Sequence, residues 1–195
     1  MRTDYIPKEI LLRILEALTP ENALVMELCM CTGMRVTDAL RMTYEDARRL
    51  VSPPAQDRLY YTYTEQKTGK ERTVFVSRDW LSRAVYVHDV RSPWLFAGRD
   101  PEKHRTRQAV WKDLHRAAKL YRVNGRRLQA RVGPHTARKV YAVDLYHQAE
   151  ENGVTDPLEL VRADLNHKDT AVTFIYALAD EITARKRRYS PKKAS

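Results

Sequence analysis

Apolar residues recur three and four positions apart along much of the chain. Within residues 7–18 these positions are Ile10, Leu11, Ile14, Leu15 and Leu18. This spacing predicts an amphipathic helix that begins at Pro7. A second helix is expected from Thr19, an N-cap residue followed by a first-turn proline, to about Thr32. It is apolar over much of its surface, which is typical of a central core helix, and Gly33 is placed to end it.

The pattern changes to that of strands after Pro53 and Pro54. Residues 59–64 are rich in tyrosine and threonine, and residues 73–77 read TVFVS, so both segments are expected to be strands. The polar segment between them, residues 66–70, contains one glycine and is suited to a hairpin turn.

Helical periodicity covers most of the remaining chain. Further helices are expected at about residues 36–42, 78–90, 106–121, 135–151, 156–165, 170–177 and 181–189. We therefore predict one mainly helical domain with a small antiparallel β-sheet, an α+β fold. This domain is expected to span residues 1–180, followed by a C-terminal helix and basic tail at 181–195. The tail carries six cations from Arg185 to Lys193 and is expected to be exposed.

Composition and charge narrow the class of protein. The 195 residues are 43% hydrophobic and 31% charged, which is ordinary for a folded protein. The net charge of +10 favours a polyanionic partner, whether DNA, RNA or an anionic membrane surface. No apolar run approaches the ~20 residues needed to span a bilayer, and the N-terminus lacks an apolar signal core, so we expect a cytoplasmic protein.

The two cysteines, Cys29 and Cys31, lie two positions apart in the second predicted helix. Their side chains should point to different faces, so a disulfide between them is not expected. A metal site would need more ligands nearby. We interpret both cysteines as small buried apolar residues in a reducing compartment.

Two segments in the first half of the chain carry cations in unusual settings. Arg35 follows Gly33 at a helix entry, with Asp38 three residues later. This pair is either a solvated ion pair or an arginine that is oriented by a carboxylate. Lys67 lies at the tip of the predicted hairpin, where a lysine often serves only solubility but can also be delivered to a groove between protein and ligand.

Two segments in the second half add histidines, an arginine and a tyrosine. His135 and Arg138 lie on one face of a helix that begins near Pro134, and a helix N-terminus favours an anion. Alternatively, they form an ordinary polar first turn. His167 lies between two predicted helices, and Tyr176 follows nine residues later. A tyrosine at a helical position more often serves packing than catalysis.

Taken together, these residues resemble the tyrosine recombinase, or phage integrase, family. The set, in chain order, comprises Arg35, Lys67, His135, Arg138, His167 and Tyr176. Asp38 corresponds to the acid that accompanies the family's first arginine, and KTGKERTVFV resembles its lysine hairpin. The resemblance spans residues 32–176, and the ordered set is far more specific than any one motif.

The chain also departs from the family pattern. Asn166 replaces the glycine of the Leu-Gly-His box, a small change because asparagine tolerates left-handed backbone. Ala137 replaces a leucine in the His-x-x-Arg box. Only about thirty residues precede Thr32, so we expect the family's upstream core-binding domain to be absent, in either a truncated or a naturally short protein.

The resemblance implies a reaction at a phosphodiester of duplex DNA. Tyr176 would attack the phosphate and form a 3′-phosphotyrosyl intermediate. Arg35 and Arg138 would stabilise the added negative charge, and Lys67 would protonate the departing 5′-oxygen. His135 and His167 would donate hydrogen bonds or shuttle the tyrosine proton, and the sequence does not divide these roles. No cofactor, ATP or metal ion is expected.

The resemblance further implies a homotetramer on double-stranded DNA, a monomeric state open to the isolated chain, and a place at the nucleoid. Candidate DNA contacts outside the catalytic set are Arg105, Arg107, Lys112, Arg126, Arg127 and Arg131. Two alternatives remain open. One is a type IB DNA topoisomerase-like enzyme, and the other is a DNA-binding regulator that has lost catalysis.

Overall fold

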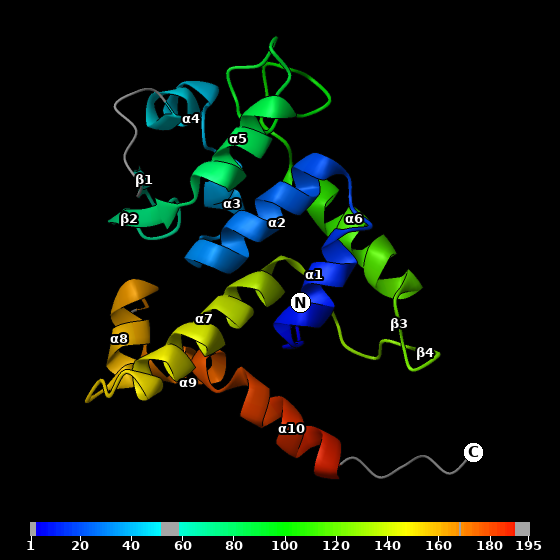
Figure 1. Ribbon diagram of the computed structural model, residues 1–195, viewed down its shortest axis with the longest axis vertical. Helices are drawn as coiled ribbons and strands as arrows, with labels where there is room; N and C mark the ends of the chain where they lie inside the picture. The colour runs from blue at the N-terminus through cyan, green and yellow to red at the C-terminus, as the bar shows by residue number, and fades with distance from the viewer. Residues whose placement is uncertain (1–2, 52–58, 168, 190–195) are drawn as a thin grey trace.

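The computed structural model describes residues 3–51, 59–167 and 169–189 (Figure 1). The helices are α1 (Lys8–Leu15), α2 (Pro20–Thr32), α3 (Val36–Ala39), α4 (Tyr44–Val51), α5 (Arg78–Tyr86), α6 (Arg107–Leu120), α7 (Pro134–Glu151), α8 (Pro157–Asp164), α9 (Thr170–Ala177) and α10 (Ala179–Tyr189). The strands are β1 (Leu59–Thr64), β2 (Glu71–Val76), β3 (Arg122–Val123) and β4 (Arg126–Arg127). This mainly helical fold with small antiparallel sheets confirms the predicted fold class.

Helix α2 forms the centre of the main core, as its apolar surface predicted. It contacts α7, α5, α1, α6 and β2, and Figure 1 shows it running between α5 and α7. Thr19 occupies the N-cap position, and Gly33 ends the helix with a φ of 66°. The end of α2 therefore lies inside the molecule, against elements from the second half of the chain.

Strands β1 and β2 pair antiparallel, with Leu59 opposite Val76 and Thr64 opposite Glu71. Their side chains alternate, so that β1 buries Leu59, Tyr61 and Tyr63 against the core. The alternation continues one residue past the strand, so the side chain of Glu65 also points inward. Core packing therefore anchors the base of the turn between β1 and β2, which carries Lys67.

A second, smaller core joins the C-terminal helices. Ala142 of α7, Val161 of α8 and Ala177 of α9 are buried together, with Leu165 between α8 and α9. Tyr176 packs against this cluster. The cluster fixes α9 relative to α7, and so places the tyrosine relative to the histidine and arginine of the His-x-x-Arg segment.

Several element boundaries differ from their predictions. The second strand begins at Glu71, two residues early, because the hairpin pairing extends to Thr64. Ser77 accepts a hydrogen bond from Trp80 N–H and caps α5, which ends at Tyr86 instead of at residue 90. The predicted helix at 36–42 is shortened to α3. Helix α4 and the β3–β4 hairpin had no predicted counterpart.

The prediction that both cysteines are buried is wrong for one of them. Cys29 is buried and faces the core, whereas Cys31 is exposed and lines a surface cavity, because two residues of helix rotate the side chain to another face. Both thiols are free, as expected. The cations of the predicted basic tail lie outside the described side chains. Among the described helices, none is both long and apolar enough to cross a membrane.

Candidate active site

A cavity of about 400 Å³ lies between α3, the β1–β2 turn and the beginnings of α6 and α7. Its charged and histidine lining residues are Arg35, Lys67, Arg107, His135 and Arg138. Four of the six residues predicted to be catalytic therefore meet around one space, although they come from distant parts of the sequence. His167 and Tyr176 join this group through Arg138, as described below.

Arg35 is held by a carboxylate that was not predicted from the sequence. Its Nη1 atom lies 2.6 Å from Oε1 of Glu65 and 3.9 Å from Oδ2 of Asp38. Glu65 is fully buried and directly follows β1, where it continues the alternation of inward side chains. An acid that continues the buried positions of a strand was the signal that could have identified it.

The pKa values of the two acids beside Arg35 are shifted in opposite directions. Burial acts to raise the pKa of Glu65, but the Arg35 guanidinium and the Thr68 hydroxyl outweigh it, so the pKa is lowered. For Asp38 burial prevails over the Gln66 N–H and Arg35, and the pKa is raised. Glu65 is therefore the principal counterion of Arg35.

Lys67 lies exposed in the turn between β1 and β2, as predicted. Gly69 completes this turn with a φ of 68°. The backbone N–H of Gln66 donates to Oδ1 of Asp38 at 3.0 Å, and the hydroxyl of Thr68 donates to Oε2 of Glu65 at 2.7 Å. The turn that carries the lysine is thus bonded to both acids next to Arg35.

Arg138 is buried at the centre of the site, on the first turns of α7. Its guanidinium donates to the carbonyl oxygens of Gly33 and Leu165, and Nη2 also lies 3.3 Å from Nε2 of His167. Burial, followed by the charge of Arg35, lowers the pKa of Arg138 to about 10, so it remains charged at pH 7. Its contacts with described residues use three of its five N–H groups.

The contacts of His167 define its tautomer. Because arginine can only donate, Nε2 of His167 accepts from Arg138, and the ring proton lies on Nδ1. Nδ1 lies 3.1 Å from Oγ1 of Thr173 in α9, which therefore acts as the acceptor. The preceding Asn166 has a φ of 52°, the left-handed geometry that its replacement of glycine implied.

Both site histidines are neutral at pH 7. Burial, followed by the charges of Arg107 and Arg138, lowers the pKa of His135 to about 4. Burial and Arg138 likewise lower the pKa of His167 to about 4. Neutral rings can accept a proton as well as donate a hydrogen bond.

Tyr176, on α9, lies beside His167, which precedes that helix. The two ring centroids are 5.3 Å apart in an edge-to-face arrangement, and Nζ of Lys139 lies 5.6 Å from the centroid of the tyrosine ring. Burial raises the pKa of Tyr176, while the positive charges of Arg138 and Arg35 act in the opposite direction. The phenol is therefore neutral at pH 7 and needs a proton acceptor before it can act as a nucleophile.

A buried polar network supports the site from behind. Arg72 of β2 donates to the carbonyl of Thr32 at 2.7 Å and to Asp164 of α8 at 2.8 Å. Tyr141 of α7 donates to the same carboxylate at 2.9 Å. These bonds join the sheet, α2, α7 and α8 around the arginines, and none of them was predicted from the sequence.

The six predicted DNA-contacting cations have different surroundings. Arg107 lines the site cavity. Arg107 is exposed, as are Lys112, Arg126, Arg127 and Arg131. Nε of Arg131 lies 3.6 Å from Asp4. Arg105 is turned inward, with Nη2 3.2 Å from Glu21 and a side chain only 20% exposed.

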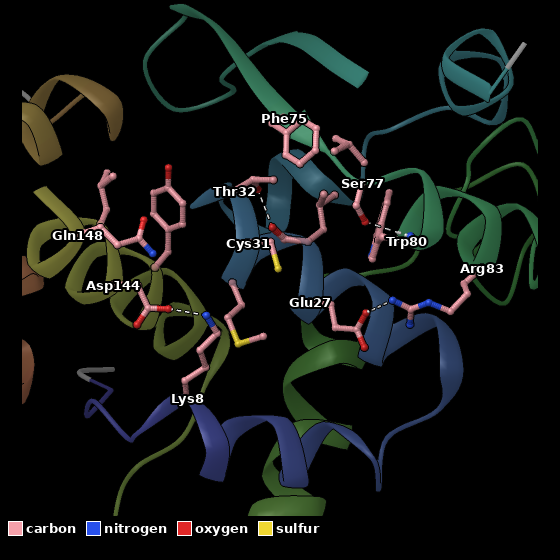
Figure 2. Close-up of a pocket in the computed structure, with 15 residues that line it drawn as sticks. Lys8, Glu27, Cys31, Thr32, Phe75, Ser77, Trp80, Arg83, Asp144 and Gln148 are labelled. Carbon is pink, nitrogen blue, oxygen red and sulfur yellow. Dashed lines mark hydrogen bonds and ion pairs between the residues drawn. The ribbon is translucent and has the colours of Figure 1, made fainter. Parts of the chain in front are cut away.

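A second cavity, of about 490 Å³, opens among α1, α2, α5 and α7 (Figure 2). Figure 2 shows two ion pairs at its rim, Lys8 with Asp144 and Glu27 with Arg83, and the thiol of Cys31 between them. Its described lining residues include none of the six predicted catalytic side chains. The first cavity, by contrast, is lined by four of them.

The chain is similar to known proteins over most of its length. A family model described as the phage integrase family matches residues 5–181. The tyrosine recombinase XerD of Haemophilus ducreyi is 25% identical over 159 residues, which are 78% of this chain and 48% of XerD. The chain thus spans about half the length of this relative.

Solved structures show the same fold. The XerH site-specific recombinase, bound to a palindromic difH substrate in a post-cleavage complex, matches with a TM-score of 0.63 and 18% identity, over 94% of this chain and 52% of XerH. The catalytic domain of bacteriophage HP1 integrase matches with a TM-score of 0.54 and 18% identity, over 97% of this chain and 96% of that domain.

Proposed function

The chain belongs to the phage integrase family, and from this premise we propose that it breaks and rejoins strands of duplex DNA at a specific site. The reaction proceeds through a covalent bond between a tyrosine and the 3′-phosphate of the cut strand. The proposed catalytic residues, with the nucleophile last, are Arg35, Lys67, His135, Arg138, His167 and Tyr176.

The observation that carries this proposal is the central position of Arg138. It shares a cavity with Arg35 and donates a hydrogen bond to His167, whose ring packs against Tyr176. A phosphate in that cavity would meet two guanidinium groups that stay charged at any working pH. A nucleophile next to such a phosphate site supports phosphoryl transfer over simple anion binding.

In the proposed cleavage step, Oη of Tyr176 forms a bond to phosphorus while the bond from phosphorus to the 5′-oxygen breaks. Added negative charge on the non-bridging oxygens is stabilised by Arg35 and Arg138. Lys67 gives its proton to the departing 5′-oxygen. Attack by a 5′-hydroxyl of a partner strand then reverses these events and rejoins the DNA.

The proton of Tyr176 must be taken up as the new bond forms. His167 and His135, both neutral at pH 7, are the proposed acceptors. His167 is the one whose ring contacts the tyrosine ring. Its Nδ1 proton is held by Thr173, so Nε2 is the accepting atom and must release its hydrogen bond from Arg138 to take the proton. Burial of the tyrosine favours its neutral form until the phosphate and a base are both in place.

Covalent trapping tests the proposal. The chain is incubated with a library of nicked duplexes whose central segment is randomised, so that the short 5′-fragment diffuses away after cleavage and the adduct accumulates. Denaturing electrophoresis isolates the adducts, and sequencing of their DNA identifies a defined substrate. We expect adducts from the wild type and none from Tyr176→Phe, which lacks the attacking oxygen.

Tyr60→Phe is the matched control, because Tyr60 is 54% exposed on β1 and should not affect the yield. An equal adduct yield from Tyr176→Phe and the wild type would rule out Tyr176 as the nucleophile. The defined substrate then separates the two related activities. Exchange of strands between two labelled duplexes supports a recombinase, whereas plasmid relaxation without exchange supports a topoisomerase-like enzyme.

We also propose duplex DNA as the partner and a tetramer on DNA as the active assembly. The structure of XerH bound to its difH substrate supports a DNA partner for the shared fold. The isolated chain is proposed to be a monomer. Light scattering with and without the trapped duplex measures both states, and a tetramer in the absence of DNA would contradict this assignment.

A further inference from the structure

Glu65 is a fully buried carboxylate whose two oxygens contact different parts of the site. Oε1 lies 2.6 Å from Nη1 of Arg35. Oε2 accepts a 2.7 Å hydrogen bond from the hydroxyl of Thr68. Thr68 directly follows Lys67 in the turn, so one carboxylate joins the arginine that would bind the phosphate to the turn that carries the proposed acid.

The backbone of Glu65 also closes this turn. Its N–H donates to the carbonyl of Lys70, and its carbonyl accepts from the N–H of Gly69, both at 2.9 Å. The side chain of Lys67 itself is exposed. The direction of the lysine is therefore set by the orientation of the turn and not by packing around its own side chain.

The burial of Glu65 indicates a use beyond stability. The inward positions of the preceding strand β1 are Leu59, Tyr61 and Tyr63, which bury apolar surface. A charged pair at such a position is often no more stabilising than well-packed apolar side chains, because both ions lose their hydration. The lowered pKa keeps the carboxylate ionised at pH 7, as its contact with the guanidinium requires.

We propose that Glu65 is a positioning residue that aligns Arg35 and the Lys67 turn with one another, a role that rests on the proposed function. Arg35 acts on the non-bridging oxygens of the phosphate, and Lys67 acts on the leaving oxygen. The carboxylate couples the two groups, so that binding of the phosphate by Arg35 and delivery of the proton by Lys67 depend on one geometry.

Two substitutions separate the two arms of Glu65. Thr68→Val removes the hydroxyl that ties the turn to Oε2 but leaves the Glu65–Arg35 ion pair in place. Glu65→Gln removes the charge that holds Arg35 and also weakens the link to the turn. Thr73→Val is the matched control, because Thr73 lies on the exposed face of the same hairpin, where its hydroxyl pairs with that of Thr62 at 2.7 Å.

Each variant is assayed by single-turnover adduct formation on the substrate identified by trapping, with either an ordinary 5′-oxygen or a 5′-bridging sulfur at the cleaved phosphate. A thiolate leaves without a proton, so the sulfur substrate does not need the lysine. Thr68→Val should lose about tenfold on the oxygen substrate and match the wild type within about twofold on the sulfur substrate. Glu65→Gln should lose on the order of a hundredfold, with only part of that loss restored by sulfur.

Thermal melting establishes that each variant is folded, and Thr68→Val alone decides the matter if Glu65→Gln does not fold. The inference is overturned if Thr68→Val behaves like Thr73→Val, or if its loss persists on the sulfur substrate. Adduct formation by the wild type on both substrates separates these outcomes from a failure of the proposed function. No wild-type adduct on either substrate would overturn the proposed function, and this inference with it.

Discussion

At the scale of single residues, burial decides which groups of the site carry charge. The two arginines remain charged, whereas His135 and His167 are neutral because burial and the neighbouring guanidiniums lower their pKa values to about 4. A histidine with an ordinary pKa near ~6.5 would be partly protonated at pH 7. The site therefore combines fixed positive charge with two rings able to accept a proton.

The lowered histidine pKa values predict a loss of stability in acid. In the unfolded chain both rings regain a pKa near ~6.5. As the pH falls from about 6.5 to about 4, the unfolded state takes up protons that the folded state does not, so the free energy of unfolding decreases. His167→Gln should make this decrease shallower, as measured by chemical denaturation at several pH values, and an unchanged slope would contradict the burial argument.

Histidine NMR provides the internal control for this prediction. His147, on the exposed side of α7, has a raised pKa because it bonds the carboxylates of Asp180 and Glu150, and it should titrate above 6.5. Long-range proton–nitrogen spectra should also show His167 with its proton on Nδ1. Titration of His135 or His167 near 6.5 in the free protein would show that the site is more hydrated than its packing indicates.

Thr173 should affect catalysis without contacting the substrate. Its buried hydroxyl accepts the Nδ1 proton of His167 and so fixes the ring tautomer next to Tyr176. Thr173→Val keeps the shape and removes the acceptor, and we expect adduct formation to slow about fivefold to tenfold. Thr173→Ser should retain most of the rate. Equal rates for the two variants in the single-turnover assay would exclude the hydrogen bond as the cause.

At the scale of elements, the end of α2 connects the two halves of the molecule. Gly33 has a φ of 66°, and its carbonyl accepts a hydrogen bond from Arg138. A Cβ at this position would lie 2.5 Å from a ring carbon of Tyr141 in α7 and 2.8 Å from the side chain of Leu165. Only glycine allows α2 to end so close to α7 and to the loop that carries His167.

Gly33→Ala should therefore destabilise the fold through both backbone strain and overlap. We expect the free energy of unfolding to fall by about 2–4 kcal/mol, as measured by denaturant titration. Gly153→Ala is the matched control, because Gly153 follows α7 with a φ of 70° but has open space around its Cα. It should lose only about 1 kcal/mol. Similar losses in the two variants would mean that strain alone, without close approach, accounts for the effect.

The elements also show what the sequence could and could not predict. Residues 59–64 and 170–177 were predicted with their observed bounds, because residue composition in a strand and periodicity in a helix are local signals. Helix α4 was missed because it has only eight residues and fully buries Ala47 alone, with Tyr44, Leu50 and Val51 partly buried against the core. The β3–β4 hairpin has two-residue strands with no buried positions, so no periodicity can reveal it.

The same distinction applies to the site. Its six proposed catalytic residues were found through ordered motifs, which are visible in sequence. Glu65 and Arg72 contact residues far away in the chain, and only the fold brings those partners together. Thr173 is only six residues from its partner His167, but no motif of the sequence marks that contact. The pairing of Arg35 with Glu65 in preference to Asp38 was likewise decided by strand geometry and not by helical spacing.

At the scale of the whole molecule, the net charge is +10, but the basic side chains are not all equally free to contact DNA. Figure 1 shows the β1–β2 and β3–β4 hairpins at opposite edges of the molecule, with α2 and α6 between them. One hairpin carries Lys67, and the other exposes Arg126 and Arg127. Many other cations form ion pairs within the protein, as Arg105 does with Glu21. We therefore expect nonspecific binding to depend on a subset of the basic residues.

Two neighbouring arginines test this expectation. The logarithm of the affinity for a labelled duplex should fall linearly with the logarithm of salt concentration, with a slope near ~0.9 for each phosphate contacted. Arg107 lines the site cavity, so Arg107→Gln should reduce the slope by about one. Arg105→Gln should leave the slope unchanged, because that guanidinium is directed at Glu21 and its side chain is only 20% exposed. Fluorescence anisotropy over a salt series measures both slopes. Equal reductions would show that Arg105 leaves Glu21 to contact DNA, so that the ion pair seen in the free chain does not limit the binding surface.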